Sequence, residues 1–245
     1  IMSKTAIIIP ARYGSSRLEG KPLIEVMGKP VIQWVYEKAK QSKLADMIIV
    51  ATDDSRIYDC VTSFGGEAEM TSINHKCGSD RIMEVVSRHP EISYICNLQG
   101  DEPLIKPESI DDVIRNVKED DNADISTLLR IITDEQEINN SNLVKCVVDN
   151  QGFALYFSRS KVPFERNTGI ATFYGHLGIY GYKRSALERM TKLNQTPLER
   201  TESLEQLRAL ENGMRIKTSL VDFVPVGIDT KEDLEKFRHI LESKL

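Results

Sequence analysis

Short apolar runs alternate with longer amphipathic segments along the first half of the chain, and this alternation restricts the fold more than any other feature. The apolar runs are rich in isoleucine and valine and have the length of buried strands. Strands separated by helices predict βαβ units, so we expect an α/β fold with a mostly parallel sheet and helices on both faces. The predicted strands are residues 5–9, 47–52, 67–70, 94–98 and 125–131, and the predicted helices are residues 30–41, 54–64 (with Asp53 as N-cap), 80–88 and 107–118.

The second half of the chain has a different pattern. Residues 144–148 and 153–157 are extended runs on either side of residues 149–152, whose Asp-Asn-Gln-Gly sequence is typical of a hairpin turn. Residues 173–182 form another extended stretch that is rich in aromatic side chains. We interpret this β-rich region as an insertion in one domain, and such an appendage often serves dimerisation.

Two helix starts carry capping-box signatures. Thr196 is followed by proline and then by Glu199, a pattern that favours a helix N-terminus. We expect the helix that begins there to run to Asn212 and Gly213. Thr230 with Asp233 is a second such start, and it predicts the C-terminal helix.

Composition and charge exclude several classes of protein. The chain has 245 residues, of which 40% are hydrophobic and 28% charged, and this excludes a disordered, collagenous or repeat-array protein. Its longest apolar runs, residues 6–9 and 47–51, are far shorter than the ~20 residues that span a bilayer, so we expect no membrane insertion. A net charge of −5 without a basic block argues against nucleic acid as the main partner.

The cysteines indicate a reducing compartment. Cys60, Cys77, Cys96 and Cys146 are spread singly, without the spacing of metal ligands. No N-terminal apolar segment resembles a secretory signal. We therefore expect free thiols and a cytoplasmic location.

Residues 10–23 are the first candidate for chemistry. They directly follow a predicted buried strand and contain Arg12, Arg17 and Lys21 together with glycines and serines. Glycines let backbone N–H groups approach phosphate oxygens, and the three cations could neutralise a triphosphate. The segment is not a Walker A loop, because Pro22 stands where Ser or Thr is needed, and it lacks the GxGxxG pattern. A solvated basic surface loop is the alternative interpretation.

Two aspartates are candidate metal ligands. Asp101 lies directly after the predicted strand 94–98, and a carboxylate that faces a phosphate site there suits Mg²⁺. Asp229 stands just before the C-terminal helix. A simple chain reversal at Asp101, or a helix N-cap at Asp229 or Thr230, would explain each residue without a metal. Because ligands of such sheets bind outside the carboxyl ends of the strands, the loops after residues 9 and 98 locate the candidate site.

Six motifs occur in an order that resembles the 3-deoxy-manno-octulosonate cytidylyltransferases, also called CMP-Kdo synthetases. The resemblance covers nearly the whole chain. It implies a Rossmann-like nucleotidyltransferase sheet, and transfer of CMP from CTP to the anomeric hydroxyl of 3-deoxy-D-manno-octulosonate (Kdo) with release of pyrophosphate and dependence on Mg²⁺. The motifs are residues 10–23, 99–103, 154–159, 176–182, 204–208 and 227–230.

The resemblance also implies roles at the nucleotide. Arg12, Lys21 and Asp101 are the implied catalytic residues, and Asp101 and Asp229 are the implied ligands of Mg²⁺. We expect direct displacement without a covalent enzyme intermediate. The implied CTP-binding residues are Pro10, Ala11, Arg12, Gly14, Ser15, Arg17, Lys21, Thr71, Ser79, Arg81 and Gln99.

A second set of residues is implied to contact the sugar acid. Arg159 is the candidate for its carboxylate, because a guanidinium can bind a carboxylate through two hydrogen bonds. Without the resemblance, His176 and Tyr180 would be interpreted as structural residues, and Glu205 and Gln206 as solvated ones. The implied sugar-binding residues are Gln99, Arg159, His176, Tyr180, Glu205 and Gln206.

We expect a single domain over residues 1–245, with a nucleotide-binding half at about 1–130 and a β-rich insertion at about 131–185 that a homodimer uses. Residues 186–245 would complete the sugar and metal site. The short connection between residues 163 and 175 is more similar to the capsule-associated branch of the family than to members in lipopolysaccharide synthesis. The resemblance implies that the cytosine lies near Ala11 and that residues 70–81 contact the base and the ribose. His75 falls in this implied nucleotide loop, whereas we expect His89 and His239 on the surface.

Two other functions stay open at this point. One is a cytidylyltransferase for a related acid, such as 8-amino-Kdo or a sialic acid. The other is a CTP-binding module without turnover, and the presence of both Asp101 and Asp229 argues against it, because a sensor need not keep two metal carboxylates.

Overall fold

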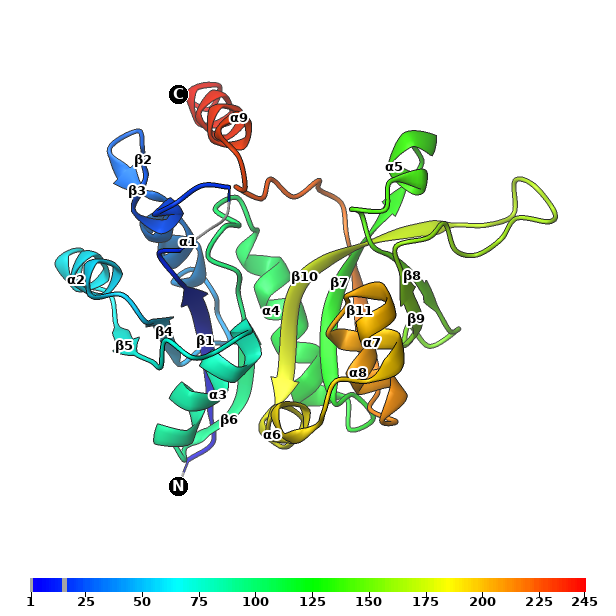
Figure 1. Cartoon of the computed structure of the whole chain (residues 1–245), viewed down its shortest axis with the longest axis horizontal. Coiled ribbons are helices and arrows are strands. Elements are labelled where there is room, and N and C mark those ends of the chain that lie inside the picture. The colour runs from blue at the N-terminus through cyan, green and yellow to red at the C-terminus, as the bar shows by residue number, and fades with distance from the viewer. Residues whose placement is uncertain (1, 15–16) are drawn as a thin grey trace. The chain divides into compact units, whose positions relative to one another are not determined.

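The computed structural model describes residues 2–14 and 17–245. The chain divides into two compact units, one of residues 1–111 with 225–245 and the other of residues 112–224 (Figure 1). The sequence analysis assigned separate functions to residues 1–130, 131–185 and 186–245, and these assignments stay predictions. Within the described residues, no helix is both long and apolar enough to cross a membrane.

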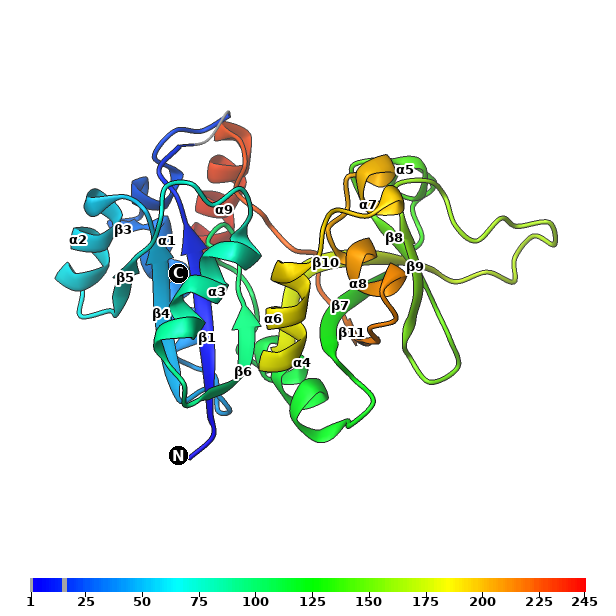
Figure 2. The ribbon, with the colours of Figure 1, turned by 60° about the horizontal axis from the view of Figure 1, so that its bottom comes forward.

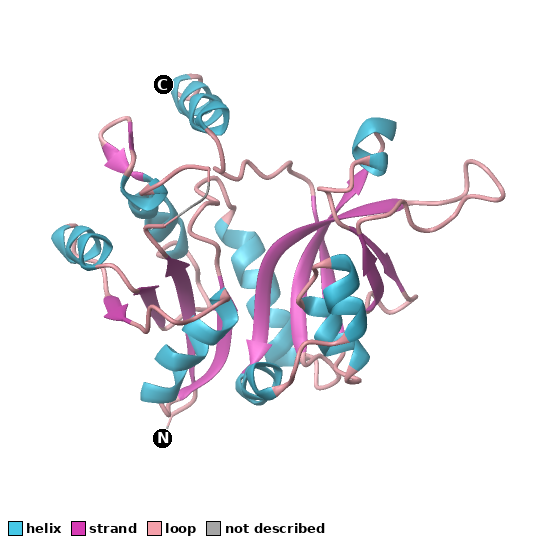
Figure 3. Ribbon diagram, viewed as in Figure 1, coloured by secondary structure: helices cyan, strands magenta, loops and turns pink. Residues whose placement is uncertain are grey.

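The sheet of the first unit is parallel throughout its described strands. Its strand order is β6-β1-β4-β5, and the isoleucine-rich run of residues 6–9 at its centre is fully buried. All four strands were predicted, with shifts of one or two residues at their ends. The strands are β1 (Lys4–Ala11), β4 (Met47–Thr52), β5 (Ala68–Met70) and β6 (Ile92–Asn97) (Figure 3).

The helices of this part of the chain also follow the predicted periodicity. They are α1 (Val31–Ala39), α2 (Ser55–Ser63), α3 (Gly78–Arg88), α4 (Pro107–Glu119, which crosses the boundary of the units) and α9 (Lys231–Glu242). The predicted N-cap of α2 was wrong by one residue. Asp54 caps the helix, since its carboxylate accepts the Arg56 N–H at 2.9 Å, whereas Asp53 binds Arg81 of α3.

The order of the strands places a crevice between β1 and β6. The chain passes from β1 to its neighbour β4 through α1, and later returns from β5 to β6 on the other side of β1 through α3. Since such crossovers are right-handed, the two helices cover opposite faces of the sheet, as Figures 1 and 2 show. The predicted arrangement is thus confirmed, and β1 and β6 flank the topological switch point where α/β proteins bind ligands.

The second unit is built on a mixed sheet. β10 (Phe173–Lys183) pairs antiparallel with β7 (Ile125–Ile132), and β11 (Ile216–Val221) pairs parallel with β7. The predicted hairpin is confirmed, because β8 (Lys145–Val148) and β9 (Ala154–Ser158) pair antiparallel. The sequence analysis missed β11, α5 (Glu135–Asn139) and α6 (Arg184–Lys192), and in the first unit the short β2 (Glu25–Val26), β3 (Lys29–Pro30) and a 3₁₀ turn, η1 (Lys21–Leu23).

The predicted single helix from Thr196 to Asn212 was wrong. The capping box at Thr196 and Glu199 does begin a helix, α7 (Pro197–Glu202), but a second helix, α8 (Gln206–Glu211), follows after a break. At the break Ser203 has a left-handed backbone, with a φ of 53°. The guanidinium of Arg159 donates to the carbonyls of Glu202 (2.7 Å) and Ser203 (3.2 Å), so a distant side chain stabilises the end of α7.

Candidate active site

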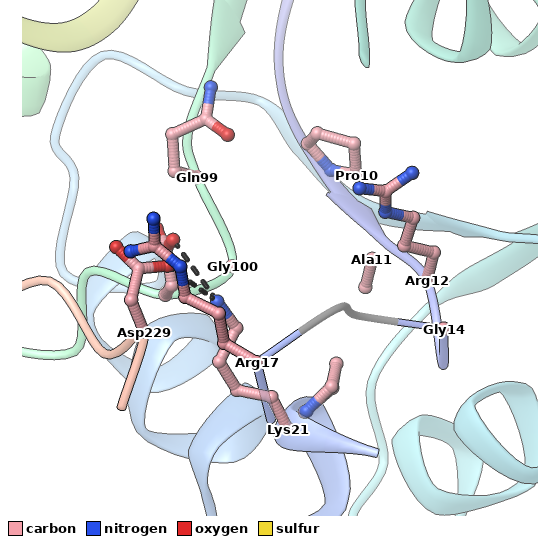
Figure 4. Close-up of a pocket in the computed structure, with 11 residues that line it drawn as sticks. Pro10, Ala11, Arg12, Gly14, Arg17, Lys21, Gln99, Gly100 and Asp229 are labelled. Atoms are coloured by element: carbon pink, nitrogen blue, oxygen red, sulfur yellow. Dashed lines mark hydrogen bonds and ion pairs between the residues drawn. The ribbon is translucent and has the colours of Figure 1, made fainter. Parts of the chain in front are cut away.

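A pocket of about 430 Å³ opens at the carboxyl ends of β1 and β6, in the size range of small-molecule sites (Figure 4). It brings together the loop after β1, the loop after β6 and the segment before α9. In Figure 4 Arg12 and Asp229 lie on opposite sides of this pocket. Its lining residues are Pro10, Ala11, Arg12, Gly14, Arg17, Lys21, Pro22, Gln99, Gly100, Asp101 and Asp229.

One ammonium group joins the two predicted metal ligands. Lys21 Nζ lies 3.4 Å from Asp101 Oδ2 and 3.2 Å from Asp229 Oδ1. Asp229 is not the cap of α9, because the Thr230 hydroxyl accepts the Asp233 N–H at 3.2 Å and so fills that role. The helix-cap interpretation of Asp229 is therefore wrong, and its carboxylate is available to the pocket.

The carboxylates of this pocket repel one another. Burial raises the pKa of Asp101, and the charge of Asp229 adds to this effect, while Lys21 opposes it. Burial and the charges of Asp101 and Asp229 raise the pKa of Glu102 to about 8. A single lysine leaves this cluster with excess negative charge, which a divalent cation would compensate. Among the described residues no group of three or more His, Cys, Asp or Glu side chains could hold a metal, so further ligands would come from phosphate and water.

Backbone contacts fix the segments that carry these side chains. The Gly20 N–H donates to the Tyr13 carbonyl at 2.8 Å. This hydrogen bond brings Tyr13 and Gly20 together just before Lys21. Gly20 has a φ of +66°, and a Cβ there would lie 2.9 Å from the Tyr13 ring, so only glycine fits. The Ile228 N–H donates to the Asp101 carbonyl at 2.9 Å and thereby holds Asp229 beside Asp101.

A second hollow of about 240 Å³ shares Pro10, Ala11, Arg12 and Gln99 with the pocket. Its other lining residues come from the start of α3 and the loop before it: His75, Lys76, Cys77, Gly78 and Arg81. The prediction named Arg81 of these, and the other four lie within residues 70–81, the segment implied to contact the base and the ribose. Lys76, Cys77 and Gly78 were not named singly in that segment.

Two of the predicted CTP-binding residues do not line either hollow. Thr71 and Ser79 are buried and lie outside the lining of both hollows, and the Thr71 hydroxyl accepts a hydrogen bond from Arg81 Nη1 at 2.5 Å. Ser15 lies outside the described residues. Of the other histidines, His239 is exposed as predicted, but His89 is partly buried between Glu69 and Glu91, so its assignment to the surface was wrong.

In the second unit, a bulge in β10 brings two of the predicted sugar-binding residues, His176 and Tyr180, together. The register of β10 against β7 shifts between Leu177 and Tyr180, and the Thr127 hydroxyl lies 2.8 Å from His176 Nε2 and donates to the Ile179 carbonyl there. The rings of His176 and Tyr180 are in edge contact, with centroids 5.5 Å apart. Burial raises the pKa of Tyr180, and the nearby charge of Glu205 adds to this effect.

Arg159 and Gln206 lie on either side of the break between α7 and α8. The Arg159 guanidinium donates to three backbone carbonyls, those of Ser141, Glu202 and Ser203, at 2.7 to 3.2 Å. Gln206 is buried at the first turn of α8. Arg159 is thus held rigidly, and two of its five N–H groups are not needed for these contacts. Its role at the sugar carboxylate stays a prediction.

The ionisation of His176 predicts an acid-dependent loss of stability. Burial lowers the pKa of His176 to about 4, whereas an unfolded histidine titrates near 6.5. Between these values only the unfolded chain binds the proton, so the free energy of unfolding falls as the pH is lowered from 6.5 towards 4. We expect the wild type to lose about 2 kcal/mol relative to His176→Asn between pH 7 and pH 5 in denaturant titrations. If the free energies of unfolding of the two proteins changed with pH in the same way, the lowered pKa of His176 would be contradicted.

A cation-rich loop and a pair of carboxylates at the switch point of an α/β sheet define a nucleotide-binding protein of the nucleotidyltransferase class. In agreement, residues 6–216 match the family described as cytidylyltransferase. The 3-deoxy-manno-octulosonate cytidylyltransferase of Thermodesulfovibrio yellowstonii is 51% identical over 94% of this chain and 95% of its own, and that of Escherichia coli is 43% identical over 100% and 98%. The chain therefore belongs to the 3-deoxy-manno-octulosonate cytidylyltransferase family, and the predicted resemblance is confirmed.

Solved structures agree with this membership. The structure of CMP:2-keto-3-deoxy-manno-octonic acid synthetase complexed with CTP has a TM-score of 0.95 and 43% identity, and the match covers 99% of this chain and 100% of that chain. A cytidylyltransferase from Leptospira borgpetersenii, with a TM-score of 0.66 and 19% identity, covers 99% of this chain and 88% of its own and shares the fold.

Proposed function

We propose that the protein transfers CMP from CTP to the anomeric hydroxyl of Kdo and releases pyrophosphate. The observation that carries this function is the convergence of Lys21, Asp101 and Asp229 in one pocket at the ends of β1 and β6. The family of the chain and the structure of its CTP-bound relative support CTP as the nucleotide. The names of its relatives support Kdo as the acceptor.

The chain's own residues account for most of the chemistry. Arg12, Arg17 and Lys21 neutralise the triphosphate, and Arg12 and Lys21 stabilise the charge that develops on the leaving pyrophosphate. The anomeric hydroxyl releases its proton to solvent and its oxygen forms a bond to the α-phosphorus. At the same time the bond from that phosphorus to the α,β-bridging oxygen breaks, and pyrophosphate leaves with the bonding electron pair. No side chain forms a covalent intermediate.

Asp101 and Asp229 would hold Mg²⁺ in this reaction. The residues fit such an ion, because two carboxylate oxygens already converge on one cation, Lys21 Nζ, and carboxylates are ligands that Mg²⁺ prefers. When bound, the ion supplies Lewis-acid activation of the α-phosphate and orients it for in-line attack.

The sugar acid would be bound by Arg159, His176, Tyr180, Glu205 and Gln206, and Gln99 also stays a predicted sugar contact. The close packing of His176 and Tyr180 beside Glu205, and the rigid support of Arg159, favour a preformed set of polar contacts. A role in lipopolysaccharide or capsule precursor supply, and a cytoplasmic location, stay predictions with this proposal.

A homodimer also belongs to the proposal. Apolar side chains are exposed on β9 and in the loop between β9 and β10: Leu155 (61% exposed), Phe164 (88%) and Ile170 (77%). An interface over this part of the second unit would cover these exposed apolar groups. Analytical ultracentrifugation should give twice the mass of the chain, and Phe164→Asp with Leu155→Asp should shift it to a monomer. A monomeric wild type would contradict the proposal.

The test of the function is pyrophosphate release from CTP and Mg²⁺ with Kdo, 8-amino-Kdo and N-acetylneuraminate offered in parallel. Fast release with Kdo alone supports the proposal. Faster release with another acid would support the transfer of CMP from CTP but would show that the assignment of Kdo as the acceptor is wrong. Binding of CTP without release in all three assays would favour a CTP-binding module.

A further inference from the structure

The loop of residues 71–77, between β5 and α3, forms one wall of the second hollow through His75, Lys76 and Cys77. It has no helical or strand structure, so backbone hydrogen bonding within an element does not set its shape. Besides a backbone hydrogen bond from Thr71 to Thr52 of β4, side chains of α3 make contacts that hold it.

Glu84 contacts this loop at two points from the second turn of α3. Its Oε2 accepts the Ser72 N–H at 2.9 Å and also lies at hydrogen-bond distance from His75 Nε2. One carboxylate oxygen thus joins the start of the loop to a residue that lines the hollow. Although partial burial acts to raise it, the pKa of Glu84 is lowered by these contacts and by the charge of Arg88, so the group is an anion.

Arg88 binds the other oxygen of the Glu84 carboxylate, Oε1. Its Nη2 donates to Glu84 Oε1 at 2.5 Å, one helical turn away, and its Nη1 donates to Glu69 Oε2 and to the Met70 carbonyl, both at 3.0 Å. The position of the Glu84 carboxylate is therefore fixed both to α3 and to β5.

Arg81 provides an independent anchor at the start of the loop. Its Nη1 donates to the Thr71 hydroxyl (2.5 Å) and to the Ser72 carbonyl (3.2 Å), and its Nη2 donates to Asp53 (3.0 Å). Of the two anchoring residues, only Glu84 contacts His75, and Glu84 itself lies outside the lining of both hollows.

We propose that Glu84 is a positioning residue for nucleotide binding, which presents His75 and its neighbours to the second hollow. The pocket next to it holds the cations and carboxylates that would face the triphosphate, so the hollow receives the remainder of the nucleotide. Glu84 does not touch the reacting centre, and it acts on the affinity for CTP through His75. This inference rests on the proposed function, because it takes CTP as the ligand of these two hollows.

The test compares Glu84→Ala, Glu84→Gln and Glu91→Ala. Glu91 is a matched control, because it also accepts from a histidine, His89, but it has no hydrogen bond to the loop. For Glu84→Ala we expect about a tenfold higher KM and Kd for CTP, from the loss of two hydrogen bonds to a charged group, with kcat within about threefold and the KM for the sugar acid unchanged. Glu84→Gln keeps one acceptor and should restore part of the affinity, while Glu91→Ala should behave as the wild type.

Two further measurements keep the result interpretable. Hydrogen exchange should show faster exchange of residues 71–77 in Glu84→Ala without nucleotide, and unchanged exchange in the core of α3. Calorimetry measures the binding of CTP without turnover. A wild-type protein that binds CTP but releases no pyrophosphate would therefore contradict only the proposed function. Wild-type CTP affinity in a folded Glu84→Ala protein, or a loss of kcat at unchanged KM, would overturn the role of Glu84. If Glu84→Ala does not fold, Glu84→Gln at wild-type affinity and exchange would also overturn it.

Discussion

The Asp101→Asn and Asp229→Asn variants should each lower kcat for CMP transfer by about a thousandfold, which corresponds to ~4 kcal/mol of lost transition-state stabilisation. Both side chains contact the same ammonium group, so each is needed to place a cation against the pocket. Asparagine keeps the shape of the side chain but removes the charge. Steady-state pyrophosphate release over a range of Mg²⁺ concentrations measures the effect.

The stability of Asp101→Asn separates this function from a structural role. Burial and the charge of Asp229 raise the pKa of Asp101, so the ionised group destabilises the folded protein at neutral pH, and the variant should unfold at an equal or higher temperature than the wild type. Asp59→Asn, on the exposed surface of α2, is the matched control and should leave kcat unchanged. Near-normal turnover of either site variant at saturating Mg²⁺ would show that the metal is misplaced.

The sequence predicted the central sheet well because its signal is local. A run of isoleucines that is followed by a glycine-containing loop and then by a helix is typical of a buried strand in a βαβ unit, and β1, β4 and β6 lie where their apolar runs stand. Local patterns also located the candidate site, since the loops after β1 and β6 meet wherever parallel strands end at one edge. Asp229, a proposed metal ligand, is different, because its sequence context also fits a helix cap. Only the tertiary structure shows that Thr230 caps α9 and that Asp229 contacts Lys21.

What the sequence did not predict depends on contacts between distant residues. The end of α7 at Ser203 is held by Arg159, which lies more than 40 residues earlier, and no capping signal marks it. The segment 70–81 was expected near the nucleotide, but which of its residues line the second hollow could not be predicted, because its irregular loop has no periodicity and contacts Glu84 and Arg81 through Ser72. These are the places where side-chain partners, and not local propensity, decide the backbone.

The buried pair of Arg208 and Glu199 should give the largest effect on stability. Arg208 Nε and Nη2 donate to the two oxygens of Glu199 at 2.9 and 2.5 Å, and Nη1 donates to the Met190 carbonyl at 3.2 Å, so one guanidinium joins α6, α7 and α8. The two residues are only 8% and 4% exposed. We expect Arg208→Met to lower the free energy of unfolding by 3–5 kcal/mol, about the cost of a buried charge without its partner, as measured by denaturant titration.

Two comparisons test the cause of this loss. Removing both charges, with Arg208→Met and Glu199→Leu together, should recover most of the stability, because apolar side chains of similar size replace the ion pair without leaving a buried charge. Arg184→Ala breaks the more exposed pair with Glu188 one helical turn away and should cost only about 0.5 kcal/mol. A loss below about 1 kcal/mol for Arg208→Met would mean that Glu199 reaches water once its partner is gone. In that case the pair would not be what holds α8, and with it Glu205 and Gln206, in place.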